Sequence, residues 1–314
     1  MTRWRDSSIA ARMTASHSLG SDPAVQGNLR AAVLMVASMA LFAIEDAAIK
    51  MLSVTLPVGE IIAVLGLMGF LTFWGLLARD GGRLVTRDLM RPVFLLRAGG
   101  ELVGTLGFVS ALALTPLASA SAILQVLPLA LVLGAALFLG ERVGWRRWLA
   151  IGAGFAGVLM IVQPWTAGFQ PLSLLALVGV VGLAARDLAT RRMPPHIPSH
   201  QLSAVAFGVL IPAGLALAAV QGTPLLRPGG TEAMLFATAA GFGILGYAAM
   251  VLATRVGEAS MIAPLRYTRL VFTMILAVTV FAERPDALTL LGAAIICGAG
   301  GFAMWREFRR KPRA

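Results

Sequence analysis

The chain alternates between long apolar stretches and short segments that are polar or charged. One apolar stretch runs from Leu117 to Leu139, and about 20 helical residues suffice to cross the ~30 Å hydrocarbon core of a bilayer. Another begins near Trp148, and its glycines and alanines let a neighbouring helix come close. The charged residues between them, in segment 141–147, are costly to place in lipid. The pattern therefore predicts two membrane-spanning helices joined by a water-facing turn.

Applied to the whole chain, the same pattern predicts ten membrane-spanning helices. They cover residues 29–52, 58–78, 93–114, 117–139, 147–163, 171–190, 201–220, 232–253, 260–282 and 287–305. Of the 314 residues, 58% are hydrophobic and 13% are charged, whereas about a quarter of the residues in a soluble domain are charged. We therefore expect an all-α integral membrane protein surrounded by a lipid bilayer.

The basic residues predict the orientation of these helices. With residues 1–28 as a cytoplasmic tail, 19 of the 26 lysines and arginines fall in cytoplasmic segments, including a second tail at 307–314. Three fall outside, and four lie within the spans. Because cytoplasmic loops of membrane proteins carry the excess of positive charge, both termini are expected in the cytoplasm. The basic tails suit anionic lipid headgroups, and no nucleic-acid partner is expected.

The two halves of the chain repeat one another at a nearly constant separation. Asp46, Lys50, Pro57 and Glu60 correspond to Asp187, Arg191, Pro198 and Gln201 at a separation of 141, and Glu141–Arg142 corresponds to Glu283–Arg284 at 142. The halves, 29–163 and 171–306, hold five spans each, and this odd number inverts the second half relative to the first. Inverted repeats are typical of secondary transporters, which bind substrate near the midplane.

The closing hairpins of the two halves, FLGERVGWRRW and VFAERPDALTLLG, carry a resemblance to a known family. Together with the five-plus-five duplication, they resemble the EamA family of the drug/metabolite transporter superfamily over residues 30–306. The resemblance implies a carrier in the bacterial inner membrane that hydrolyses no ATP and often exports amino acids or related metabolites. It also implies a central cavity lined by the first, third and fourth helices of each half.

Six ionisable residues in the first, third and sixth spans are candidates for function, because each charge is costly in lipid. One interpretation is that they neutralise one another in internal ion pairs, as an arginine and a glutamate four residues apart on a helix can. The other is that an acid among them binds a proton or a substrate amine. The six are Glu45, Asp46, Arg97, Glu101, Arg186 and Asp187.

The span 260–282 holds two further arginines, Arg266 and Arg269, which are three residues apart and point in nearly the same direction. Either acids from other helices pair with them, or a substrate anion does. Because a guanidinium fits a carboxylate with two parallel hydrogen bonds, one of them is expected to bind a substrate carboxylate. Arg269 lies deeper in the span, whereas Arg266 could extend towards the cytoplasm.

Neutral polar residues complete the predicted binding site. Tyr267 corresponds to Gln125 in the first half at a separation of 142, and both are expected near the midplane. Tyr247, in the span 232–253, is a third candidate for substrate binding. The alternative is that each of these side chains only bonds a neighbouring helix.

These features predict a secondary transporter that works by alternating access, with an exporter of amino acids, aromatic or neutral ones included, as the first choice. A cavity with both arginines and carboxylates complements the two charges of an amino acid. The alternative cargo is a larger anionic or aromatic metabolite, such as a flavin or nucleoside derivative. An intramembrane enzyme is the third hypothesis, but the chain contains no HExxH or GxSxG motif. No cofactor or metal site is expected, because the chain has one cysteine and three histidines. The sequence does not determine the oligomeric state, and a monomer is compatible with it.

Overall fold

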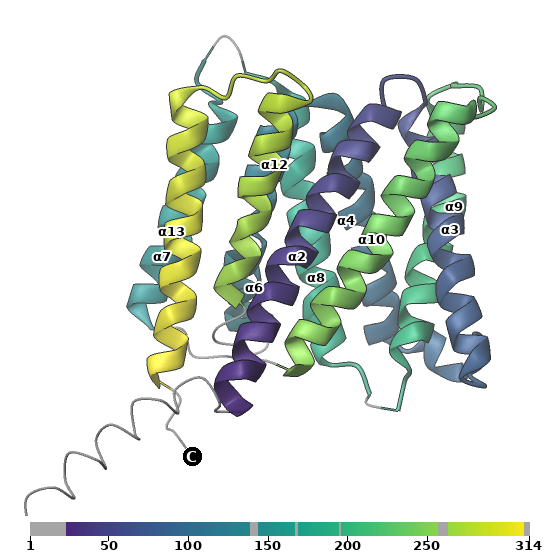
Figure 1. Ribbon diagram of the computed structural model, residues 1–314, viewed down its shortest axis with the longest axis horizontal. Helices are drawn as coiled ribbons and strands as arrows, with labels where there is room; N and C mark the ends of the chain where they lie inside the picture. The colour runs from purple at the N-terminus through teal and green to yellow at the C-terminus, as the bar shows by residue number, and fades with distance from the viewer. Residues whose placement is uncertain (1–22, 139–143, 167–168, 195, 257–262, 311–314) are drawn as a thin grey trace, which may run out of the picture.

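The computed structural model describes residues 23–138, 144–166, 169–194, 196–256 and 263–310, and within these ranges every regular element is a helix (Figure 1). The α-helices are α2 (Pro23–Leu52), α3 (Val58–Arg79), α4 (Pro92–Leu114), α5 (Leu117–Leu124), α6 (Leu127–Phe138), α7 (Trp145–Val162), α8 (Leu174–Arg191), α9 (Ser199–Val220), α10 (Gly230–Val256), α12 (Thr268–Thr279) and α13 (Ala287–Arg310). Short 3-10 helices are η1 (Arg87–Met90), η2 (Pro171–Ser173) and η3 (Ala263–Tyr267). The all-α prediction is confirmed for the described residues.

The described helices overlap the predicted spans, but they differ in how well they fit a bilayer. Seven segments are long and apolar enough to cross a membrane, judged by length and composition. These segments are Leu29–Leu52, Val58–Arg79, Pro92–Leu114, Leu117–Phe138, Pro171–Arg191, Ser199–Val220 and Gly230–Met250. The apolar helices Trp148–Val162 and Ala287–Phe302 are shorter. The exact number of ten spans therefore stays a prediction, and the predicted elbow at Glu141 and Arg142 lies outside the described residues.

Prolines mark where several helices begin. Helix α4 starts with Pro92, and α3, α5 and α9 directly follow Pro57, Pro116 and Pro198. Proline has a backbone dihedral suited to the first helical turn and lacks an N–H group that would have no partner there. These prolines thus divide the apolar sequence into separate helices.

Two of the predicted spans are interrupted. The span 117–139 consists of α5 and α6, which are separated at Gln125 and Val126, and Pro128 lies in the first turn of α6. At the break, the N–H groups of Gln125 and Val126 bond to carbonyls three residues back, as in a 3-10 turn. In the described part of the span 260–282, the 3-10 helix η3 likewise precedes α12 directly. The two interruptions fall at corresponding places in the two halves.

Helices of one half pack against helices of the other. Helix α2 packs against α10, α4 against α8, α3 against α9, and α7 against α13. Some pairs approach so closely that only glycine fits: a Cβ atom on Gly59 of α3 would lie 2.5 Å from the carbonyl oxygen of Gly214 on α9. The same holds for Gly157 of α7, whose Cβ would lie 2.8 Å from the carbonyl oxygen of Gly292 on α13.

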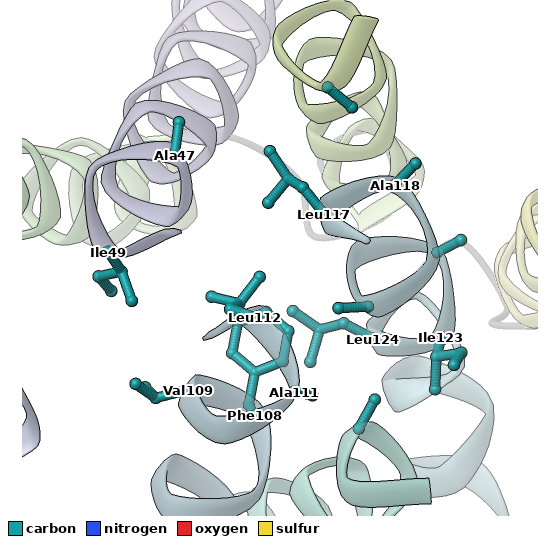
Figure 2. Packing of buried hydrophobic residues seen from close by; sticks show 14 of the residues in the cluster. Ala47, Ile49, Phe108, Val109, Ala111, Leu112, Leu117, Ala118, Ile123 and Leu124 are labelled. Carbon is teal, nitrogen blue, oxygen red and sulfur yellow. The ribbon is translucent and has the colours of Figure 1, made fainter. Parts of the chain in front are cut away.

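Buried apolar side chains fill the space between these helices, while large apolar side chains cover the outside. Figure 2 shows side chains of α2, α4 and α5 pointing towards one another, with Ala47, Phe108, Leu112 and Leu124 among them. Residues such as Val181 of α8 are exposed, as suits a helix that faces lipid. Helix α2 begins at the end of the bundle where helix α13 ends (Figure 1).

Candidate functional site

A bidentate ion pair joins α2 to α12 inside the bundle. The Arg269 guanidinium donates to Asp46 through Nε to Oδ2 at 3.0 Å and through NH2 to Oδ1 at 2.7 Å. Asp46 is 1% exposed. Such parallel charge-assisted hydrogen bonds are strong and directional, so Arg269 binds a carboxylate of its own chain in this conformation.

Two aromatic rings also contact the Arg269 guanidinium. Its Cζ atom lies 5.2 Å from the ring centre of Phe42 on α2 and 5.8 Å from that of Phe108 on α4. A cation over a ring face is attracted by the ring quadrupole within about 6 Å. Arg269 therefore connects three helices, and a substrate carboxylate at this position would have to compete with Asp46.

A second group of charges lies between α4 and α8. Arg186 NH1 lies 3.1 Å from Glu101 Oε1, and Arg186 Nε lies 2.8 Å from Asp187 Oδ1. The Thr105 hydroxyl donates a longer hydrogen bond to Glu101, at 3.4 Å. The expected acids and arginine are thus brought together, with Glu101 bonded to Arg186 of the facing helix.

Arg97 does not pair with Glu101, although the two share a helix face. Its Nε donates to Thr190 Oγ1 at 3.1 Å, and its NH1 donates to the Leu202 carbonyl at 2.9 Å. Arg97 is buried and ties α4 to both α8 and α9. Two neutral acceptors on neighbouring helices, rather than an acid on its own helix, satisfy this guanidinium.

Two of the predicted charged residues, Glu45 and Arg266, form no ion pair with another described residue. The Glu45 carboxylate lies against Gly243 of α10, where an added Cβ would be 2.6 Å from Oε1. No hydrogen-bond or ion-pair partner of Glu45 is present among the described residues. Arg266 donates to the thioether Sδ of Met250 at 3.1 Å, which is a weak acceptor, and this is its one hydrogen bond within the described part of the chain.

Three neutral side chains are buried without a hydrogen-bond partner in the described structure: Ser121 Oγ, Gln125 Nε2 and Tyr267 Oη. They are 2%, 6% and 8% exposed, respectively. Gln125 is the residue at which α5 ends, Ser121 lies one turn before it, and Tyr267 is the last residue of η3. Because buried polar groups in proteins are almost always hydrogen-bonded, the two helix interruptions hold an unusual concentration of unmet hydrogen-bonding capacity.

Ser121 was not among the residues expected from the sequence, although a signal existed. It lies four residues before Gln125 and therefore on the same helix face. Tyr247, which was expected near the other candidates, contacts Phe73 of α3 edge to face at 5.7 Å between ring centres. Phe73 in turn stacks on Phe207 of α9. Tyr247 thus belongs to an aromatic cluster between α3, α9 and α10.

Polar contacts at the end of the bundle opposite the start of α2 and the end of α13 were not predicted from the sequence. Both carboxylate oxygens of Glu283 accept hydrogen bonds from the N–H groups of Leu117 and Ala118, at 2.6 and 3.0 Å. These N–H groups begin α5, and an anion is favoured at a helix N-terminus. The Lys50 ammonium donates to the Thr115 carbonyl just before that helix. Repetition of the Glu–Arg pair in the sequence pointed to Glu283 but not to this role.

Asp286, in the same region, is the cap of α13. Its Oδ1 accepts from the Thr289 N–H at 2.8 Å, and its Oδ2 accepts from Gln163 Nε2 at 2.6 Å. Hydrogen bonds from Thr289 and Gln163 stabilise the charged form and hold the pKa of Asp286 below its usual range. The contact ties the end of α7 to the beginning of α13.

Comparison with known proteins places this arrangement among transporters. The EamA-like transporter family matches residues 29–163 and 171–304. A riboflavin transporter of Rhizobium johnstonii is 32% identical over 67% of this chain and 68% of its own length. An S-adenosylmethionine uptake transporter of Rickettsia felis is 28% identical over 73% of this chain and 77% of its own. The pseudopaline exporter CntI of Pseudomonas aeruginosa is 28% identical over 84% and 92%.

A solved structure has the same fold. It covers 87% of this chain and 97% of its own, with a TM-score of 0.61 and 20% sequence identity. The family match extends over both halves of the chain, in agreement with the two repeats and with the helices that carry the buried charges. The chain is therefore a member of the EamA-like transporter family, a membrane transporter and not an enzyme.

Proposed function

We propose that this protein is a secondary carrier of the bacterial inner membrane, with ten spans in two inverted repeats and both termini in the cytoplasm. The packing of the helices supports the inversion. Counted in span order, the first span packs against the eighth and the third span packs against the sixth. The first and sixth spans are equivalent in the two halves, as are the third and eighth, so one contact is the repeat of the other. The second and seventh, and the fifth and tenth, pair with their own equivalents.

The observation that carries the proposal is the pair of interrupted helices with buried, unbonded polar side chains. Transporters with inverted repeats form their substrate sites at discontinuous helices near the midplane. Here Gln125 and Ser121 lie at one interruption and Tyr267 lies at the other. We propose that hydrogen bonds to substrate, formed when the carrier opens, satisfy these three groups.

Arg266 is the proposed partner of an anionic group on the substrate. The Arg269 guanidinium is already bonded to Asp46. The Arg266 guanidinium, in contrast, has only a thioether acceptor among the described residues. Arg269 as a carboxylate site stays a prediction that requires Asp46 to be displaced. In this proposal, the other candidate residues connect the helices around the site and do not bind substrate. These residues are Arg97, Glu101, Arg186, Asp187 and Tyr247.

The proposed cargo is a charged or polar metabolite with a planar ring system, larger than a common amino acid. The relatives described above are named for riboflavin, S-adenosylmethionine and pseudopaline, and riboflavin and S-adenosylmethionine both contain nitrogen-rich rings. The neutral hydrogen-bonding groups of Ser121, Gln125 and Tyr267 suit the polar atoms of such rings better than the two charges of an amino acid. Amino-acid export stays a prediction, and the direction of transport is open because these relatives include uptake and export proteins.

Counterflow in proteoliposomes tests this proposal. The purified protein is reconstituted and loaded with riboflavin, S-adenosylmethionine, a nucleoside or an amino acid, and uptake of the same labelled compound is measured. We expect exchange of a ring-containing compound. Gln125→Leu should weaken its apparent affinity roughly two- to tenfold, as loss of a neutral hydrogen bond of about 0.5–1.5 kcal/mol implies.

Gln221→Leu is the matched control, because Gln221 is exposed at the end of α9. It should behave as the unmodified protein does. Exchange of amino acids alone would support the amino-acid prediction instead. Exchange of no compound, with the protein correctly inserted, would contradict the carrier proposal.

A further inference from the structure

Of the acidic residues that the structure describes, four lie beyond the first turn of a membrane-spanning helix, and three of these four have an arginine partner. Asp46 bonds Arg269, and both Glu101 and Asp187 bond Arg186. Glu45 is the exception, since its carboxylate has no hydrogen bond or ion pair among the residues that the structure describes. Neighbouring residues of one helix thus differ completely: Asp46 is neutralised by an arginine, and Glu45 is not.

Around Glu45, the residues that the structure describes offer no replacement for such a partner. Helix α10 presents Gly243 to the carboxylate, with Tyr247 one turn further along. The charged groups that act on Glu45 are Asp46 beside it, which repels it, and Arg269 from α12, which attracts it. However, Arg269 directs both its Nε and NH2 groups at Asp46, so its donors are already used there.

A carboxyl group in this position favours its neutral form. An ionised side chain inside a membrane protein needs an opposite charge or water, and without them its burial is very unfavourable. The neutral acid carries no charge and tolerates a contact with apolar surface. Asp46, Glu101 and Asp187 differ from Glu45 in that each contacts an arginine, which offers the carboxylate an opposite charge.

We propose that Glu45 is the proton-binding residue of this carrier, holding a proton in the conformation described and releasing it when the site opens to water. This inference rests on the proposed carrier function. Binding adds a proton to the carboxylate oxygen, and release restores the anion. The anion then competes with Asp46 for Arg269, so that proton release changes the contact between α2 and α12. Proton binding is in this way linked to α12, the helix that directly follows Tyr267.

Labelling with a hydrophobic carbodiimide tests the protonation of Glu45 without any knowledge of the substrate. The reagent dicyclohexylcarbodiimide adds to protonated carboxyl groups, and the O-acylisourea rearranges to a stable N-acylurea. We expect the full-length protein in detergent near neutral pH to be labelled at Glu45 and not at Asp46, Glu101 or Asp187, as located by mass spectrometry of peptides. Labelling should fall as the pH is raised. Equal labelling of the four acids, or none at Glu45, would overturn the proposal.

Transport measurements with Glu45→Gln form the second arm. Riboflavin and S-adenosylmethionine serve as probes, and Glu101→Gln is the comparison, since it removes a carboxylate that has an arginine. We expect Glu45→Gln to retain counterflow of the probe that the unmodified protein exchanges, while losing accumulation driven by a pH gradient. Glu101→Gln should retain a response to the gradient.

The outcomes separate the two proposals. An unmodified protein that exchanges a probe but ignores a pH gradient overturns the proton site and leaves the carrier function intact. The proton site is likewise overturned if Glu45→Gln accumulates the probe as the unmodified protein does. If neither probe is exchanged, or if Glu45→Gln does not fold, the labelling of the unmodified protein still decides whether Glu45 is protonated.

Discussion

The carboxylate of Glu60 accepts a hydrogen bond from the backbone N–H of Leu226, at 2.9 Å, and the second half of the chain repeats this contact. Gln201, 141 residues after Glu60, donates through Nε2 to the carbonyl of Leu84, also at 2.9 Å, and Leu84 precedes Leu226 by 142 residues. One contact ties the start of α3 to the segment after α9, and the other ties the start of α9 to the segment after α3. This exchange is what a two-fold relation between the halves requires.

The two contacts differ in chemistry, which leads to an asymmetric mutational prediction. Glu60→Gln should be tolerated, because an amide oxygen can still accept the Leu226 N–H. Gln201→Glu should destabilise the protein by about 1–3 kcal/mol, since a carboxylate cannot donate to the Leu84 carbonyl and leaves it unsatisfied. Thermal unfolding in detergent measures both. Equal losses for the two variants would show that these contacts do not contribute as described.

Removal of the arginine from the Asp46–Arg269 pair should destabilise the fold. Arg269→Ala leaves Asp46 as an uncompensated buried charge, at an expected cost of about 3–5 kcal/mol. The double variant Arg269→Ala with Asp46→Asn should recover much of this loss. Arg266→Ala is the control, and it should cost less because Arg266 has no acid partner among the described residues. The midpoint of thermal unfolding gives the comparison, and additive effects of the two changes would contradict direct pairing.

Asp286 should make stability depend on pH in the acid range. Because its pKa is lowered in the folded protein, its contribution is fully present above the ordinary carboxyl pKa and is lost as the pH falls through the folded value. Asp286→Ala should cost about 0.5–2 kcal/mol at neutral pH, as loss of a helix cap does. The difference from the unmodified protein should shrink on acidification. A difference that stays constant with pH would exclude the charged cap.

Labelling of introduced cysteines tests the orientation in the membrane. In a Cys297→Ala background, cysteines at Thr166 and Gly229 should react with an impermeant thiol reagent from outside the cell. Cysteines at Gly81 and Ser199 should react only after the cytoplasmic face is opened. The reason is the strong excess of arginine in the segments assigned to the cytoplasm. A site that reacts from the wrong face would break the ten-span inverted arrangement.

Several contacts of the site could not be foreseen from the sequence. The helix spacing of Arg97 and Glu101 suggested an ion pair, yet Arg97 bonds Thr190 and Leu202 instead. Intrahelical spacing says which side chains can meet, but not whether an acceptor on another helix lies closer. The spacing from Gln125 could have indicated the helix face of Ser121, but whether its hydroxyl finds a hydrogen-bond partner depends on helices that lie far away in the sequence.

The sequence by itself determined the positions of the helices, the duplication and the set of buried charges. In lipid, backbone groups must bond within their own segment, so each apolar run of sufficient length becomes a helix, and charges within it stand out. The tertiary structure alone decided which charges pair, because Asp46 and Arg269 are 223 residues apart and meet only where α2 packs against α12. It therefore also decided that Glu45, beside Asp46, has no hydrogen-bond or ion-pair partner among the described residues.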